Sequence, residues 1–394
     1  MAGRAGGLYD PFSYRVQLDP YPTYRILRDK FPAYHNEERG FWALSRYDDI
    51  QAATSDWQTF SNEAGVSIDG TGQLFGPGNF LDSDPPRHDD LRAVIRGTFT
   101  PKNIQRLEGR VRAKVTELID AFVNCESADL AEEFAWALPV SVISELLGFP
   151  REDQKVREGW ARTVLIREPD DNQLPSAAVE TLTTMRSYFT DTMKARRQAV
   201  GEDLLSDIVS AEVNGKRLTE AEIVGMTFLL FVAGTETTAS LLGNSLLLLE
   251  QHADQRAELI KNPSNIPKAI EELLRYESPI QNLARVTTRD VELHGGTISE
   301  GSRVLLLYAS ANRDDRRFHN PDCLDLKREP KRNMAFGNGI HFCLGAPLAR
   351  LETRIALEEI LSRVPNYRVD GLVERLHTHE SRPLARLPVA LAPR

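Results

Sequence analysis

The sequence contains little cysteine and no long hydrophobic run, and each deficit excludes a class of protein. Three of its 394 residues are cysteine, which is too few for a small disulfide-stabilised secreted domain and indicates a compartment where thiols stay reduced. No stretch approaches the ~18 consecutive apolar residues that a membrane-spanning helix needs. Residues 1–11 contain no signal-type apolar segment. We therefore expect a soluble, cytoplasmic protein without a membrane partner.

Positive charge is scarce as well. Lysine and arginine number 48 against 57 aspartates and glutamates, which gives a net charge of −9 and argues against a nucleic-acid partner. The hydrophobic fraction of 41% and the charged fraction of 27% are those of an ordinary globular protein. Repeats, low-complexity tracts and linker-like segments are not evident in the sequence, so we expect residues 1–394 to form a single domain.

Against this background, residues 336–352 form the most informative stretch of the chain. Three glycines within nine residues allow positive-φ turns and a close approach of the backbone to a flat ligand. Cys343 stands where this loop gives way to an apolar helical pattern, so we expect its sulfur to face the free amides of a helix start, where a thiolate is favoured.

A lone thiolate limits the kind of metal site that this loop can form. No second Cys or His lies at metal-ligand spacing from Cys343, which leaves too few ligands for structural zinc or an iron–sulfur cluster. A single thiolate suits the one protein ligand of a haem iron. A buried, inert cysteine before a helix is the alternative for any lone Cys.

A long apolar helix is predicted in the middle of the chain. Thr219 and Glu222 have the spacing of a capping box, and the pattern that follows continues to about Glu250, roughly 48 Å at 1.5 Å per residue. Residues 226–233 are apolar on all sides of such a helix, which predicts a central, buried position.

Residues 234–238 interrupt this apolar helix with Gly-Thr-Glu-Thr-Thr. The glycine weakens the helix, and the hydroxyl residues can bond a carbonyl one turn back and bend it. A carboxylate at Glu236 is costly in a buried helix unless it has a partner or a task. The alternative is a kinked core helix with incidental hydroxyls.

Three further patterns point to a site. Residues 63–80 form a long, glycine-rich loop of the kind that acts as a lid or binding segment. In the proline-initiated helix of residues 84–96, His88 shares one face with two arginines, a basic stripe that suits an anion or is ordinary surface charge. Glu272 and Arg275 lie one helical turn apart and can pair, either inside the protein or on its surface.

Helical patterns dominate the rest of the chain, with a few extended segments between them. We expect helices at 19–28, 47–55, 103–123, 133–147, 155–167, 177–197 and 269–278, a strand at 41–45, an extended segment at 285–288, and a hairpin over 291–307 with Gly295 and Gly296 in its turn.

Together, these stretches resemble the cytochrome P450 family of haem-thiolate monooxygenases. The pattern Phe-x-x-Gly-x-x-x-Cys-x-Gly of residues 336–345 is similar to the family's haem-binding signature. Ala-Gly-x-Glu-Thr-Thr at residues 233–238 resembles its oxygen-activation motif, and residues 272–275 match its Glu-x-x-Arg. The resemblance covers essentially the whole chain and is strongest from Phe231 onward. It implies a mainly α-helical fold with small β-sheets, in which haem lies between the long central helix and the cysteine loop.

The resemblance also implies roles for particular residues. Cys343 would ligate the iron of haem b, and Glu236 and Thr237 would deliver protons, although many members have Asp in place of Glu236. The haem contacts would be His88, Arg92, Ala233, Gly234, Arg285, Phe336, Gly337, His341, Cys343 and Gly345, of which His88, Arg92, Arg285 and His341 would meet the propionates. Ala233 and Gly234 would be small to admit haem and dioxygen.

Other residues would have supporting roles. Glu272 and Arg275 would be structural, with Arg313 of the segment 312–314 joining them. Residues 382–389 would form a closing hairpin. The substrate pocket would include Val66, Leu229, Val232, Ala233, Gln281, Leu283 and Leu384, with Gln281 or Asn282 as polar handles.

The implied function is that of a soluble, bacterial-type class I monooxygenase acting on an apolar small molecule and O2. Its electrons would come from a ferredoxin and a ferredoxin reductase, because no flavin or iron–sulfur module is evident. The ferredoxin would dock on cations beside the cysteine: Arg92, Arg96, Lys102, Lys331 and Arg332. The alternatives are a haem-thiolate peroxygenase or isomerase and a non-catalytic haem sensor or carrier, none of which needs proton delivery.

Overall fold

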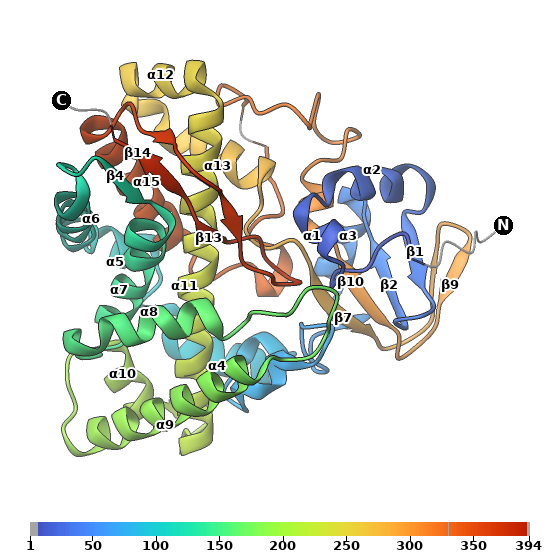
Figure 1. Ribbon diagram of the computed structural model, residues 1–394. Helices are drawn as coiled ribbons and strands as arrows, with labels where there is room; N and C mark the ends of the chain where they lie inside the picture. The colour runs from blue at the N-terminus through green and yellow to red at the C-terminus, as the bar shows by residue number, and fades with distance from the viewer. Residues whose placement is uncertain (1–6, 330, 392–394) are drawn as a thin grey trace.

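The computed structural model describes residues 7–329 and 331–391 (Figure 1). The expectation about the first eleven residues falls partly on residues 1–6, which lie outside the described residues. The helices are α1 (Tyr14–Leu18), α2 (Tyr21–Lys30), α3 (Tyr47–Ser55), α4 (Arg87–Arg96), α5 (Pro101–Gln105), α6 (Glu108–Phe122), α7 (Ala137–Leu146), α8 (Gln154–Thr163), α9 (Ser176–Gln198), α10 (Leu204–Ser210), α11 (Glu220–Gln251), α12 (Ala253–Lys261), α13 (Ile266–Tyr276), α14 (Tyr308–Ala311) and α15 (Ala346–Arg363).

The expected helices are present, with three differences. The helix predicted at 155–167 is α8, which ends at Thr163. The predicted helix at 103–123 is divided into α5 and α6 by Arg106 and Leu107. The predicted helix at 133–147 begins as a π-helical turn, Ala131–Trp136, that continues into α7. The glycine-rich segment 63–80 is a loop with one short 3₁₀ turn, Thr71–Phe75, before a second turn begins at Phe80.

The strands are short and form several small sheets. They are β1 (Ala33–Asn36), β2 (Phe41–Leu44), β3 (Phe60–Ser61), β4 (Ser127–Asp129), β5 (Glu212–Val213), β6 (Lys216–Arg217), β7 (Leu283–Thr287), β8 (Val291–Leu293), β9 (Gly296–Ile298), β10 (Arg303–Leu306), β11 (Arg368–Val369), β12 (Glu374–Arg375), β13 (Leu384–Arg386) and β14 (Pro388–Ala390). The largest sheet has the order β1-β2-β10-β7-β3, and β10 runs parallel to β2 but antiparallel to β7.

Two predicted hairpins differ from the observed pairing. β8 and β9 do form a hairpin, but β10 leaves it to join the largest sheet. The closing hairpin over 382–389 is wrong: β13 pairs with β12, whereas β14 pairs with β11 and β4. Only Leu387 separates β13 from β14, and that is too short a connection for two strands to turn back on each other.

The hydrophobic core is divided between a helical part and a part built on the largest sheet. Helices α6, α7, α9, α11 and α15 contribute to the first cluster, and β2, β7 and β10 with α2 and α3 to the second. In Figure 1 the sheet lies on the right and most of the helices lie on the left. The geometry of the site described below depends on α11 and on the loop before α15.

Helix α11 runs through the helical part, as its sequence predicts. Thr219 and Glu222 form the expected capping box, and the helix continues without a break for 32 residues. By length and composition α11 could cross a membrane, although polar residues interrupt its apolar sequence. However, 83% of its most apolar window is buried inside the protein against α7, α9 and other helices, so its apolar surface is used in the core.

Candidate functional site

The loop that carries Cys343 is closed by backbone hydrogen bonds and glycine turns. Gly337 and Gly339 both have φ of +69°, as expected, but Gly345 has an ordinary φ of −78° and caps α15. A Cβ at Gly339 would collide with the carbonyl oxygen of Thr54, so the loop can lie against α3 only with glycine there. The amide of Cys343 donates to the carbonyl oxygen of Phe336 across 2.9 Å.

The thiol of Cys343 lies at the start of α15 and is partly exposed. Burial raises its pKa above the ordinary value, while the amides of Gly345 and Ala346 and the charges of Arg92 and Arg350 lower it. The helix start therefore acts in the predicted direction on the thiol pKa, but burial has the larger effect. A coordinated metal ion deprotonates a thiol in such a place.

Two imidazoles and an arginine of the predicted haem contacts meet beside this loop. The ring centroids of His88 on α4 and His341 lie 4.4 Å apart, and Nη2 of Arg92 donates to the carbonyl oxygen of Phe342 across 2.6 Å. Nε2 of His88 and both ring nitrogens of His341 are buried without a protein partner. Arg96, the third residue of the predicted basic stripe, is exposed at the end of α4.

Arg285 on β7 faces the same space from the sheet. It is buried, donating to the carbonyl oxygen of Ala284 across 2.7 Å and, at 3.4 Å, to the hydroxyl of Tyr308. Burial, reinforced by Arg285, His88 and Arg92, lowers the pKa of His341 to about 2. Burial thus favours the neutral imidazole of His341 in the protein, and its contact with a propionate stays a prediction.

Helix α11 presents a small exposed patch within its buried middle. Ala233 is exposed and Thr237, one turn further, is partly exposed, while Val232, Thr235 and Glu236 are buried. The hydroxyl of Thr237 donates to the carbonyl oxygen of Ala233 across 2.8 Å. This back-bonding occurs as predicted, and the helix remains continuous.

Gly234 has a packing reason that the sequence did not indicate. A Cβ at this position would lie 3.1 Å from Cγ1 of Ile143 on α7, a distance tighter than most real contacts. The absence of a side chain therefore allows α11 and α7 to approach each other. Contact of Gly234 with a haem stays a prediction.

Glu236 points toward the C-terminal loop between β12 and β13. Oγ of Ser381 donates to Oε1 of Glu236 across 2.5 Å, and both residues are buried. Burial raises the pKa of Glu236 to about 7; the Ser381 bond opposes that rise, Glu380 adds to it, and His379 and Arg167 oppose it. A carboxyl group with a pKa near neutral can both release and accept a proton. Nothing in the sequence pattern indicated Ser381.

Most of the predicted pocket residues are buried, but two have other roles. Val66, Leu229 and Val232 are buried, and Leu283 is partly exposed. The amide group of Gln281 is used within the protein: Nε2 donates to the carbonyl oxygen of Ser278 across 2.7 Å, and Oε1 accepts from the hydroxyl of Tyr24 at 3.4 Å.

Asn282 and Leu384 have contacts that the sequence did not indicate. Asn282 donates to the carbonyl oxygen of His379, but its Oδ1 is buried without a partner, so it is the better polar handle. Leu384 packs against Gly243, ten residues and therefore about 15 Å along α11 from Ala233. Its place in the substrate pocket stays a prediction.

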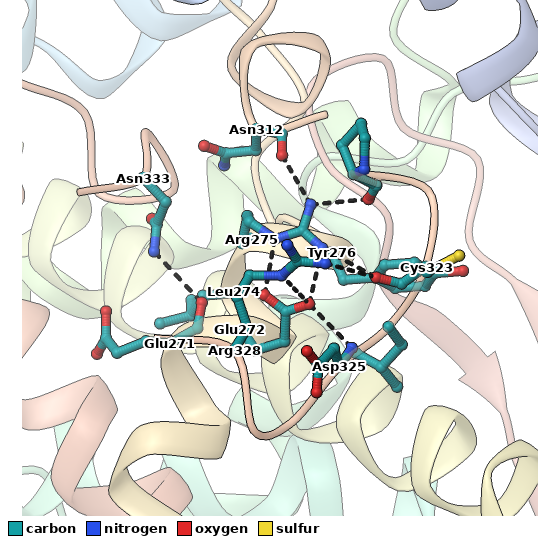
Figure 2. A network of polar contacts seen from close by, with 12 residues as sticks. Glu271, Glu272, Leu274, Arg275, Tyr276, Asn312, Cys323, Asp325, Arg328 and Asn333 are labelled. Atoms are coloured by element: carbon teal, nitrogen blue, oxygen red, sulfur yellow. Dashed lines mark hydrogen bonds and ion pairs between the residues drawn. The ribbon is translucent and has the colours of Figure 1, made fainter. Parts of the chain in front are cut away.

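The Glu272–Arg275 pair is buried and forms the centre of a polar network (Figure 2). Two nitrogens of Arg275 donate to the two carboxylate oxygens of Glu272, each across 2.7 Å. Nη1 of Arg275 donates to the carbonyl oxygens of Asn312 and Pro321. Since Asn312 in turn accepts from the amide of Met334 across 2.6 Å, the network anchors the chain that leads into the cysteine loop.

The third member of this network is Arg328, not Arg313. Nε of Arg328 donates to Glu272 across 3.0 Å. The guanidinium of Arg313 instead lies between the rings of Tyr21 and Tyr276, at 3.6 and 3.8 Å from their centroids. The flat, delocalised guanidinium group favours such stacking. No local sequence pattern marked Arg328 as the partner of Glu272.

The residues present fit a haem. A thiol lies beside unpartnered imidazole nitrogens and two arginines, which suit an iron and the carboxylates at the edge of the same group. Within residues 7–329 and 331–391, no cluster of three or more His, Cys, Asp or Glu side chains is placed to hold a metal ion. A cofactor that brings its own equatorial ligands needs only one from the protein.

Comparison with known proteins places this site in a class. The family model for cytochrome P450 matches residues 172–370. The chain is 40% identical over 390 residues to a putative cytochrome P450 123 of Mycobacterium tuberculosis, covering 98% of this chain and 97% of the relative. It is 38% identical over 368 residues to the cytochrome P450 monooxygenase PikC of Streptomyces venezuelae, covering 89% and 85%.

Solved structures show the same fold. The cytochrome P450 PksS of Bacillus subtilis matches with a TM-score of 0.89 and 34% identity, over 98% of this chain and 100% of the other. A Bacillus megaterium cytochrome P450 crystallised with testosterone matches with a TM-score of 0.89 and 30% identity, over 96% and 99%.

Fold and comparisons thus define an oxidoreductase that acts on a small molecule with O2 and a redox partner. The chain belongs to the cytochrome P450 family and is a monooxygenase. Membership implies a haem cofactor and confirms the predicted fold class.

Proposed function

We propose that this chain, as a single cytoplasmic domain, uses haem b to insert one atom of O2 into an apolar small molecule, with electrons from a ferredoxin and its reductase. The observation that carries the proposal is the arrangement on α11. A buried acid with a pKa near 7 directly precedes a hydroxyl on the exposed face of an otherwise buried helix. That arrangement suits proton delivery.

The cofactor would be held by residues from four parts of the chain. Sγ of Cys343 would ligate the iron, and Phe336, Gly337 and Gly345 of the same loop would lie against the ring. His88 and Arg92 from α4, Arg285 from β7 and His341 would hydrogen-bond the carboxylates. The two histidines would use ring nitrogens that have no protein partner. When bound, the haem supplies the oxidation chemistry.

Glu236 and Thr237 would deliver protons in the reaction. Because the hydroxyl of Thr237 donates to Ala233, its oxygen lone pairs remain available to accept a hydrogen bond on the exposed side. Because burial raises its pKa to about 7, the Glu236 carboxyl is present in both its protonated and its ionised form near neutral pH. Glu236 can therefore supply a proton toward Thr237 and be reprotonated without a large energetic cost.

The apolar residues of the pocket favour an uncharged substrate. No cation is among Val66, Leu229, Val232 and Leu283, and Asn282 offers a single polar contact. Terpenoid, steroid, macrolide or aromatic compounds fit this lining better than fatty acids. A solved relative was crystallised with testosterone, although another was crystallised with an acyl carrier protein that carries hexadec-9Z-enoic acid.

A ferredoxin would dock beside the cysteine loop. Arg92 bonds Phe342 of this loop, and Arg332 bonds Asn338, while Arg96, Lys102 and Lys331 are exposed. A groove of about 320 Å³ lies among α5, α13 and α15, next to the start of α15. A concave surface flanked by cations suits an acidic electron carrier.

The test uses two substitutions. Cys343→Ala should abolish the ferrous carbonyl absorption of the thiolate-ligated haem, whereas Cys323→Ala, at an exposed cysteine, should leave it intact. Thr237→Ala should divert a large share of the NADH electrons from product to hydrogen peroxide. An unchanged carbonyl spectrum in the first variant would refute the site. Unchanged coupling in the second, with peroxide-driven turnover intact, would favour a peroxygenase.

A further inference from the structure

The best-defined polar contact of Glu236 is with a residue outside α11. Ser381 lies 145 positions away in the sequence, and its hydroxyl donates to Oε1 of Glu236 across 2.5 Å. The exposed fraction is 5% for Glu236 and 4% for Ser381. A short hydrogen bond to a carboxyl group inside a dry region is among the stronger polar contacts in a protein.

The hydroxyl of Ser381 is itself fixed by its neighbours. Oγ1 of Thr378 lies 2.7 Å from Oγ of Ser381 and also donates to the carbonyl oxygen of Ser381 across 2.8 Å. The amide N–H of Ser381 in turn donates to Oγ1 of Thr378 across 3.2 Å. Two residues that bind each other through both backbone and side chain leave the serine hydroxyl little rotational freedom.

The loop that carries these residues is attached to the sheet region. Ser381 forms an isolated β-bridge with Ile280, and the amide of Gln281 donates to the carbonyl oxygen of Glu380 across 2.6 Å. Asn282 donates to the carbonyl oxygen of His379 across 2.8 Å. The donor to Glu236 is therefore mounted on a rigid support rather than on a free loop.

Charged groups from three segments surround the same carboxyl. His379 and Glu380 lie on the C-terminal loop, and Arg167 follows α8. Arg167 is paired at 2.5 Å with Asp69 of the glycine-rich loop, which in turn lies 3.8 Å from Nε2 of His379. Of these, Glu380 raises the pKa of Glu236, and His379 and Arg167 lower it.

We propose that Ser381 is a positioning residue for proton delivery, whose hydroxyl holds the Glu236 carboxyl in one orientation with support from Thr378. A glutamate has three rotatable side-chain bonds, so without such a contact its carboxyl would be distributed over several orientations. The length of the glutamate side chain also explains how an acid on α11 reaches the loop that carries Ser381. This inference rests on the proposed role of Glu236.

The experiment follows the Glu236 carboxyl itself in the ferric holoenzyme. The infrared C=O stretch of the protonated acid is assigned by its loss in Glu236→Gln and is then titrated with pH. Ser381→Ala should move the band to higher frequency, because the carboxyl loses a hydrogen-bond donor. It should also raise the titration midpoint by about one pH unit, because hydrogen bonds to the charged form are lost.

Two variants separate positioning from general damage. Ser381→Thr keeps the hydroxyl and should restore both band and midpoint. Ser245→Ala removes a buried hydroxyl on α11 that has no partner and should change neither. If Ser381→Ala does not fold, Thr378→Val, which removes the support but keeps the donor, should shift the band in the same direction by a smaller amount.

The outcomes distinguish this inference from the proposed function. An unshifted band and midpoint in Ser381→Ala, or in Thr378→Val when that variant replaces it, would overturn the positioning role alone. Unchanged product yield per NADH in Glu236→Gln would instead refute proton delivery by Glu236, whatever the band shows.

Discussion

Burial of single titratable groups creates most of the chemistry of this site. Glu236 has a pKa near 7 because its carboxyl is buried beside Glu380, and the hydrogen bond from Ser381 only partly offsets that effect. His341 is held neutral by burial and by three neighbouring positive or ionisable groups. Both residues gain their properties from segments that lie far away in the sequence.

The raised pKa of Glu236 predicts a pH-dependent stability. The folded protein binds a proton more tightly than the unfolded chain, whose glutamate has a pKa near 4.5. This group therefore favours folding most at pH values below about 4.5, and the benefit is lost as the pH rises to about 7. The total loss is about 3 kcal/mol.

Glu236→Gln should remove this dependence. Urea unfolding of the holoenzyme should be measured between pH 5 and pH 8. As the pH rises, the free energy of unfolding of the variant should increase relative to that of the unmodified protein by up to about 3 kcal/mol. Glu37→Gln, at an exposed position, serves as the control. Its free energy of unfolding should depend on pH in the same way as that of the unmodified protein. A parallel curve for Glu236→Gln would contradict the raised pKa.

Residue identities could be predicted where a short motif carried them. Cys343, Glu236 and Thr237 were recognisable because their spacing within one segment is distinctive. Ser381 and Arg328 were missed, since neither has a local pattern and each acquires its role only when the chain folds against a distant acid. The pairing of the strand that carries Leu384 with β12 was not visible in the sequence.

At the level of elements, α11 and the glycine-rich loop meet backbone to backbone. A Cβ at Gly225 would lie 2.8 Å from the amide nitrogen of Gly78 and 3.0 Å from the carbonyl oxygen of Phe75. A Cβ at Gly78 would collide with the carbonyl oxygen of Glu222. The loop that contains Val66 is therefore held against the first turns of α11 by two glycines.

Gly225→Ala should push this loop away from α11. The backbone atoms cannot move aside as a side-chain tip can, so we expect a loss of about 1 to 3 kcal/mol of stability and faster proteolysis between residues 63 and 80. Gly109→Ala is the matched control, because Gly109 lies in α6 with no atom within 4 Å of the added Cβ. That change should be neutral or stabilising. Equal protease resistance in Gly225→Ala would contradict the close contact.

Element positions were predictable to the extent that they are local. The capping box of α11 and the bounds of α3 follow from side chains within the element, and both are confirmed. Strand partners were not predictable, because β2 pairs with β10 across about 260 residues and no local signal specifies that choice.

For the whole molecule, charge distribution matters more than net charge. The chain has a net charge of −9, yet exposed cations occur near the cysteine loop at Arg96, Lys102 and Lys331. An acidic ferredoxin would be attracted to this face while being repelled elsewhere, which orients it during the encounter.

Charge reversal at this face should therefore slow reduction without affecting substrate. Arg96→Glu and Lys331→Glu should each reduce the ferredoxin-dependent reduction rate about tenfold at low ionic strength, with less effect in high salt. Lys194→Glu, on α9 at another exposed position, should have little effect. Reduction rates that do not change in either variant would count against this docking face.

The strand order of the largest sheet also dictates when this protein can fold as it is made. β1 and β2 emerge from the ribosome first, but their sheet neighbour β10 follows only after some three-quarters of the chain has been synthesised. Until then the nascent hairpin keeps an open edge, and α11 emerges before α15 exists to cover it. An unpaired strand edge is prone to aggregation during this interval, so we expect the β1–β2 edge to be a site at which incomplete chains associate.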